Sequence, residues 1–106
     1  MHRGERLNKT LREELGILIT RELELSTLLT LTSVEVDEDF RVAKVKFSTL
    51  PSHKAPEILK ILQKKGGWLR SLLDKKIRIK SIPRFVFEID YGLEKAAEIE
   101  KELLKK

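Results

Sequence analysis

Apolar residues recur at helical spacing near the start of the chain. Arg12, Glu13 and Glu14 fall largely off the face that these residues share, as expected for a helix with one buried side. The apolar stripe consists of leucines at intervals of four, four and three residues: Leu7, Leu11, Leu15 and Leu18. The pattern predicts an amphipathic helix from about Glu5 to Glu24.

Strict alternation replaces helical spacing in the next part of the chain. Residues 30–36 place a Thr or Val at every second position, and residues 43–48 alternate apolar side chains with Lys and Ser. Such alternation indicates two strands that each bury one face. In the second strand, the Lys and Ser side chains place the opposite face in solvent. The acidic segment Asp37–Asp39 between them has the length of a turn, so an antiparallel hairpin is expected.

Two short amphipathic patterns follow, on either side of a double glycine. Pro51 ends the second strand, and Pro56 suits the first turn of a helix, where a missing N–H costs nothing. Apolar stripes lie before and after the glycines: Ile58, Ile61 and Leu62, then Leu69, Leu72 and Leu73. Because glycine is unfavourable inside a helix, we expect two helices that meet at Gly66-Gly67.

The remainder of the chain predicts one more strand and one more helix. Lys75–Lys80 is expected to be extended, Phe85–Ile89 alternates like a strand, and helical spacing resumes from Leu93 onward. The order α-β-β-α-α-β-α predicts an α+β fold in one domain spanning residues 1–106. We expect a mixed three-stranded sheet with its first two strands antiparallel and its helices packed on one face.

The composition is typical of a globular chain. With 41% hydrophobic and 37% charged residues it should fold, because disorder requires lower hydrophobicity or a more one-sided charge. The absence of Cys excludes disulfides and thiolate metal sites. No apolar run approaches the ~18 residues of a membrane span, and the polar N-terminus lacks a signal-peptide core, so a cytoplasmic protein is expected. Abundant Lys and Glu with only two amides is the bias of hyperthermophiles.

The positive charge is concentrated in one segment. Residues 54–84 hold ten Lys or Arg against two acids, a net charge of +8, whereas the whole chain carries +5 and the rest therefore sums to −3. A concentrated basic face on a small domain is the electrostatic footprint of a nucleic-acid binder.

Each feature of this segment has a structural interpretation beside the functional one. Gly66-Gly67 serves as a helix cap and turn, and the cations around it add a phosphate contact as a second role. Trp68 could stack on a base, but its place before Leu69 favours a core anchor. The alternating run Lys76–Lys80 fits either a charged edge strand or, as we favour, a row of phosphate contacts.

Catalytic and metal-binding patterns are missing from the sequence. His2 and His53 are far apart and lack partners for a ligand set, so no metal is expected. No nucleophile–base pairing, phosphate loop or zinc-protease motif is present. A non-enzymatic protein without cofactors is therefore expected.

Several stretches, in order along nearly the whole chain, resemble the ribosome-binding factor A family. Its members are similar to type II KH domains but replace the Gly-x-x-Gly loop with a shorter kink, commonly Ala-x-Gly. Lys65-Gly66-Gly67 occupies that place here, so Gly67 matches the family pattern and Lys65 departs from it. The resembling stretches are residues 34–37, 43–45, 67–73, 77–83, 84–87 and 90–94.

The resemblance implies a KH-like assembly factor that is monomeric when free. It would bind the small (30S) ribosomal subunit through its 16S rRNA, with ribosomal proteins as further contacts, and assist late rRNA maturation, including during cold adaptation. The alternative is a protein-interaction module whose basic surface is incidental. The residues expected to contact RNA surround the kink and the basic run: Lys60, Lys64, Lys65, Gly66, Gly67, Arg70, Lys75, Lys76, Arg78 and Lys80.

Overall fold

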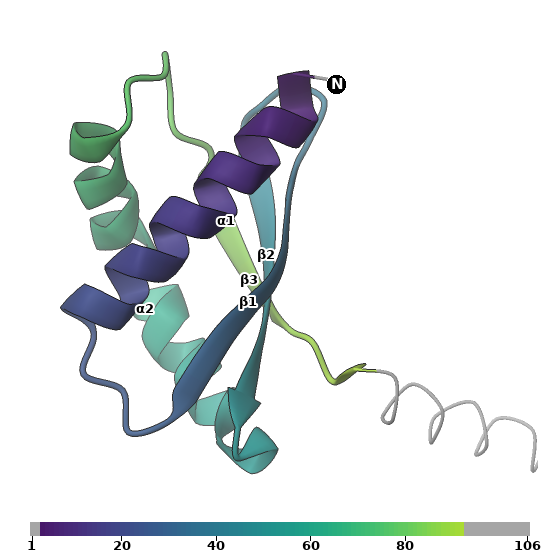
Figure 1. The fold of residues 1–106 in the computed structure, drawn as a ribbon, viewed down its shortest axis with the longest axis vertical. Coiled ribbons are helices and arrows are strands. Elements are labelled where there is room, and N and C mark those ends of the chain that lie inside the picture. The colour runs from purple at the N-terminus through teal and green to yellow at the C-terminus, as the bar shows by residue number, and fades with distance from the viewer. Residues whose placement is uncertain (1–2, 93–106) are drawn as a thin grey trace, which may run out of the picture.

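A computed structural model describes residues 3–92, and the helix predicted from Leu93 onward lies outside this range. Two helices, a three-stranded sheet and one short 3₁₀ turn make up the described part (Figure 1). In chain order they are α1 Arg3–Glu22, β1 Leu28–Val36, β2 Val42–Leu50, η1 Ser52–Lys54, α2 Ala55–Lys76 and β3 Arg84–Ile89.

The sheet is mixed, as the sequence predicts. Its order is β1-β2-β3, with β1 antiparallel to β2 and β3 parallel to β2. The register between β1 and β2 shifts between Leu31 and Ser33, which leaves Thr32 as an extra residue in β1. Phe85–Ile89 belongs to strand β3, which confirms the prediction for this segment.

Both helices cover the same face of the sheet (Figure 1), so the prediction of helices on one face is confirmed. α1 packs mainly on β1, and α2 packs mainly on β3. The central strand β2 contributes fully buried Ala43, Val45 and Phe47, whereas Lys44 and Lys46 between them are exposed. The alternation of β2 therefore separates a dry face from a wet one, because side chains of a strand point alternately to opposite faces.

α1 follows its leucine stripe closely. Leu11, Leu15 and Leu18 are buried, and Leu7 is half-buried against the same core. The Asn8 side chain accepts a hydrogen bond of 2.9 Å from the Val36 N–H, which ties the start of α1 to the end of β1. The helix ends at Glu22, two residues before the predicted end.

The prediction of two helices meeting at Gly66-Gly67 is wrong, because α2 runs without interruption from Ala55 to Lys76. Leu62 and Leu69 lie seven residues apart, so both apolar stripes fall on one continuous helix face. A helical glycine costs roughly 1 kcal/mol relative to alanine, and the packing of this stripe outweighs that cost. Gly66 also contributes to the fit, since a Cβ at this position would lie 3.4 Å from the ring of Phe87.

The prediction of an extended basic run from Lys75 to Lys80 is also wrong. Lys75 and Lys76 form the last turn of α2, and the Ile77 N–H still bonds to the Leu73 carbonyl at 2.9 Å. Residues 77–83 then connect α2 to β3 without pairing with any strand of the described sheet. Their apolar side chains anchor this connection in the core, with Ile82 buried and Ile77 half-buried.

Candidate nucleic-acid interface

The continuous α2 aligns several predicted contact residues along its solvent side. Positions that are three or four residues apart lie on the same side of a helix. This spacing connects residues 60, 64, 67, 68, 71 and 75, all of which are exposed. We call this surface the α2 outer face, made of Lys60, Lys64, Gly67, Trp68, Ser71 and Lys75.

Trp68 belongs to this outer face and is not the core anchor that the sequence favoured. Its side chain is 43% exposed, and the Lys65 ammonium lies 5.5 Å from the centroid of its ring. One residue along a helix is a turn of about 100°, so Trp68 points away from the stripe that contains the buried Leu69. The seven-residue interval between Leu62 and Leu69 was the signal for this placement, since it predicts one helix face for both.

The two glycines have different surroundings. Gly66 faces inward against Phe87, so this predicted contact residue lies on the packed side of α2. Gly67 has open space where a Cβ would be and helps to line a hollow of about 440 Å³. Gly67 does not have a positive φ, since among the described residues only Phe40 and Gly92 do, so it forms neither the cap nor the turn that the sequence predicted.

Arg70 and Lys80 lie beside the Gly67 hollow. The Arg70 Nε donates a hydrogen bond of 2.8 Å to the Ile82 carbonyl and so fastens the 77–83 connection to α2. Arg70 is therefore a structural residue as well as a cation. Arg78 and Lys80 are exposed on the same connection, while Ile77 and Ile79 pack against the core.

The Lys76 side chain points toward α1 and does not belong to the α2 outer face. Its Nζ lies 2.8 Å from Glu14 Oε2 on α1, and both side chains are only about one-third exposed. One residue along the helix is a rotation of about 100°, so Lys76 lies on the side of α2 that faces α1, whereas its neighbour Lys75 points outward. The ion pair neutralises Lys76, so its predicted phosphate contact is not supported by its position.

The open face of the sheet carries charges of both signs. Lys44 pairs with Glu88 over 3.9 Å. The Thr32 hydroxyl and the Gly92 N–H, which donates to Asp90 Oδ1 over 2.9 Å, hold the pKa of Asp90 below its ordinary value, and Lys46 acts in the same direction. Such a mixed surface is a poor match for a polyanion compared with the α2 outer face.

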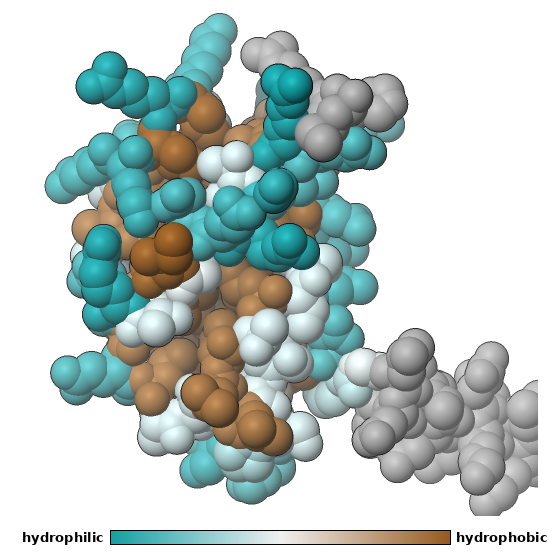
Figure 2. Space-filling view, in the orientation of Figure 1, coloured by the Kyte–Doolittle hydropathy of each residue, from teal (hydrophilic) through white to brown (hydrophobic). Residues whose placement is uncertain are grey.

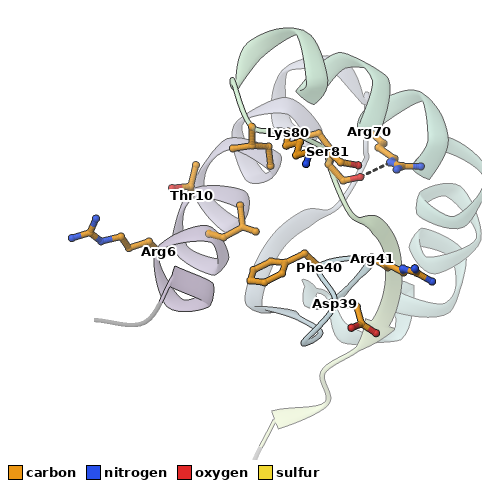
Figure 3. A pocket seen from close by; sticks show the side chains of 11 residues that line it. Arg6, Thr10, Asp39, Phe40, Arg41, Arg70, Lys80 and Ser81 are labelled. Carbon is orange, nitrogen blue, oxygen red and sulfur yellow. Dashed lines mark hydrogen bonds between the residues drawn. The ribbon is translucent and has the colours of Figure 1, made fainter.

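The structure also reveals a hollow that sequence analysis missed. It lies between the start of α1, the β1–β2 turn and the 77–83 connection, and it involves Arg6, Phe40 and Arg41 (Figure 3). The three segments are far apart in the sequence, and the signal that the sequence offered was an aromatic residue, Phe40, directly after the acidic turn.

Other kinds of site find no support in the part of the chain that the structure describes. No helix there is long and apolar enough to cross a membrane. No group of three His, Cys, Asp or Glu side chains in the same part is arranged to hold a metal ion.

Comparisons with known proteins agree on one family. The family model for ribosome-binding factor A matches residues 3–103. The ribosome-binding factor A of Desulfitobacterium hafniense is 39% identical over 101 residues, which span 92% of this chain and 81% of the relative. The crystal structure of ribosome-binding factor A from Thermus thermophilus superposes with a TM-score of 0.73 at 21% identity, covering 83% of this chain and 97% of that one.

A second structural neighbour is a homology model of the Thermus thermophilus factor, fitted into a cryo-electron microscopy map of a 30S complex. It is 24% identical with a TM-score of 0.66, covering 78% of this chain and 90% of that one. These structural likenesses support the fold, and the family model together with the 39% identical relative decides the membership. The chain belongs to the ribosome-binding factor A family.

Proposed function

We propose that this protein is a non-enzymatic assembly factor that binds the small (30S) ribosomal subunit through its 16S rRNA. It would act in the cytoplasm as a single KH-like domain and as a monomer when free. By holding a late rRNA intermediate it would assist maturation, including during cold adaptation. Membership of the family supports the ribosomal partner, and a Thermus relative has been placed in a 30S complex.

The α2 outer face is the observation that carries the proposed binding surface. Lys60, Lys64 and Lys75 are exposed along one side of a rigid helix. None of these three ammonium groups forms an ion pair within the described part of the chain. They lie along one side of the helix, where they can contact the phosphate backbone of an RNA strand, and phosphate contacts position a protein without reading sequence.

Trp68 and Gly67 complement these cations. An exposed aromatic ring can stack on any base, because every base offers a π face. The space above Gly67 allows the backbone of an RNA strand to approach the helix closely. The proposed mechanism is therefore positional: cations hold the backbone while Trp68 supports a base beside it.

A specific observation favours protein contact as the alternative. Leu28 and Leu50 are paired across β1 and β2, and they are 71% and 68% exposed. Figure 2 shows more continuous hydrophobic surface toward the end of the molecule where β1 begins, and hydrophilic side chains crowd the opposite end. An exposed apolar pair of this kind suits a ribosomal protein better than RNA.

Co-sedimentation with purified small subunits, large subunits and whole ribosomes tests the proposal. We expect binding to small subunits that weakens steeply with rising salt. Replacing Lys60, Lys64 and Lys75 by Ala should reduce the slope of log affinity against log salt by about 2 to 3, since each phosphate contact accounts for roughly 0.7 to 0.9.

Lys44→Ala with Lys46→Ala is the matched control, because it removes exposed lysines from the open sheet face. This control should bind small subunits like the parent. Equal binding by the parent and the triple variant at every salt concentration would refute the α2 outer face. Salt-insensitive binding that disappears when Leu28 and Leu50 become Ser would support the protein-interaction alternative.

A further inference from the structure

The hollow between the start of α1, the β1–β2 turn and the 77–83 connection, which we call the Phe40 hollow, has the size of a ligand site. Its volume is about 800 Å³, within the range of roughly 300 to 1,000 Å³ that is usual for small-molecule sites. Leu7 of α1 and Ile79 and Ile82 of the 77–83 connection form apolar walls, and Phe40 of the β1–β2 turn stands at one side. Three segments that are distant in the sequence therefore enclose one apolar space.

Phe40 has an unusual backbone conformation. Its φ is 58°, in the left-handed region that bulky residues rarely adopt. The turn is held in place by Asp37, whose carbonyl accepts from the Phe40 N–H at 3.0 Å. The Asp37 carboxylate also accepts from the N–H groups of Arg41 at 2.8 Å and Val42 at 3.2 Å. Strained positions that persist under such constraint cluster at binding sites.

The ring of Phe40 remains accessible from solvent. It is 39% exposed, and Figure 3 shows it directed toward the space between the turn and α1. A phenylalanine that only filled the core would be covered. The turn instead presents an aromatic face at the opening of an apolar space, which suits a flat aromatic ligand.

The charges around the hollow favour an anionic ligand. Arg6, Arg41, Arg70 and Lys80 line it against one acid, Asp39. The Arg6 and Arg41 side chains extend away from Phe40 on opposite sides (Figure 3), so their charges lie outside the apolar interior and leave it free. A flat apolar body with attached negative charge is the chemistry of a nucleotide, whereas an apolar peptide side chain would gain nothing from these cations.

The hollow is continuous with the proposed RNA surface. Arg70, Lys80, Ser81 and Ile82 line both the Phe40 hollow and the Gly67 hollow, so the 77–83 connection separates the two by the width of one segment. An RNA strand that follows the α2 outer face can cross this connection. Its next nucleotide would then lie at the opening beside Phe40.

We propose that the Phe40 hollow holds one unpaired nucleotide of the bound RNA. Its base stacks on Phe40 against Leu7 and Ile79, and its phosphates contact the cations at the rim. This inference rests on the proposed RNA binding and adds a site on the side of the 77–83 connection away from Gly67. An unpaired base is required, because a base within a duplex is stacked and paired and is not free to enter a hollow of the protein surface.

Phe40→Asn tests the inference with little risk to folding. Asn tolerates a positive φ, so thermal unfolding should occur at the same temperature or higher, while the aromatic face is removed. The probe is a short single-stranded RNA that carries one 2-aminopurine, whose fluorescence reports stacking. We expect binding weakened by about 5- to 100-fold, the effect of removing one stacked base, with an unchanged salt slope. Phe40→Tyr should bind like the parent.

Arg6→Ala with Arg41→Ala provides the complementary measurement. It should reduce the salt slope by roughly 0.7 for each phosphate of a single strand that the two arginines neutralise. A fully paired duplex of the same sequence should show no difference between the parent and Phe40→Asn.

The outcomes separate this inference from the proposed function. If the parent binds RNA with a steep salt dependence and Phe40→Asn binds equally well, the nucleotide site is wrong and the RNA-binding function stands. If the parent binds neither the single strand nor small subunits, both are wrong. If Phe40→Asn leaves RNA binding intact but weakens binding to an isolated ribosomal protein, the hollow is a protein site.

Discussion

At the scale of single residues, two adjacent glycines show that the surrounding atoms determine the role of a residue. Gly66 and Gly67 share one helix and one backbone conformation, yet only Gly66 lies against another side chain, the ring of Phe87. The absence of a side chain permits close packing at Gly66, whereas Gly67 leaves an open surface.

Gly67→Ala should stabilise the protein by about 0.5 to 1 kcal/mol, because alanine has the higher helix propensity and meets no neighbour. Gly66→Ala should gain less, since its Cβ would lie 3.4 Å from Phe87 Cε2, at the near limit of ordinary contact. Urea unfolding of both variants measures the difference. A loss of stability in Gly67→Ala would show that this glycine is needed for the fold.

Asp90 couples stability to acid pH. The pKa of its carboxyl in the folded protein lies below the ordinary value of 3.8. The ionised carboxylate therefore stabilises the fold above pH 3.8, and this stabilisation is lost as the pH falls through the lowered pKa of the folded state. Asp90→Asn should therefore be less stable than the parent at neutral pH, and this difference should shrink in strong acid. Urea midpoints across this range test it, and a difference that does not change with pH would contradict the assignment.

At the scale of elements, neighbouring cations of the continuous helix α2 have different roles. Lys75 lies on the α2 outer face, and Lys76 pairs with Glu14 of α1 at 2.8 Å. Arg70 holds the 77–83 connection through the Ile82 carbonyl. Charge in this segment is thus divided between binding and structure by the direction in which each side chain leaves the helix.

Lys75→Ala and Lys76→Ala should behave as opposites. Lys75→Ala should weaken RNA binding and reduce the salt slope by roughly 0.7 to 0.9, with little change in stability. Lys76→Ala should keep the slope and lose up to about 1 kcal/mol of stability, because a partly exposed ion pair is worth little more. A Glu14 and Lys76 double-mutant cycle isolates the pair, and equal RNA-binding losses in the two single variants would count against this division.

At the scale of the whole molecule, charge is distributed unevenly. The segment 54–84 carries +8 and the rest of the chain −3. The open sheet face mixes charges of both signs, as the Lys44–Glu88 pair shows. Attraction to a polyanion is therefore expected on the side where α2 and the 77–83 connection lie.

Binding should be broad in sequence preference. Phosphate contacts carry no sequence information directly, and a single base in the Phe40 hollow would add only a modest preference. Affinities for unrelated single-stranded RNAs, measured at one salt concentration, should differ by less than about 100-fold, or roughly 3 kcal/mol. A larger spread would indicate direct base recognition.

The sequence by itself determined the elements whose periodicity is unambiguous. Leu11, Leu15 and Leu18 of α1 are buried as their spacing predicts, and alternation in β2 separates buried Val45 from exposed Lys46. A buried face repeats with the period of the element, so local order is enough to predict it. The location of the positive charge also followed directly from the sequence.

Only the tertiary structure decided which way particular side chains point. The sequence could not show that packing would keep α2 helical through Gly66-Gly67. Because the helix is continuous, Trp68 lies at the surface and Lys76 points toward Glu14. The Phe40 hollow is a product of folding alone, because its walls come from α1, the β1–β2 turn and the 77–83 connection. Periodicity describes one element at a time, whereas contacts between distant segments exist only once those elements pack together.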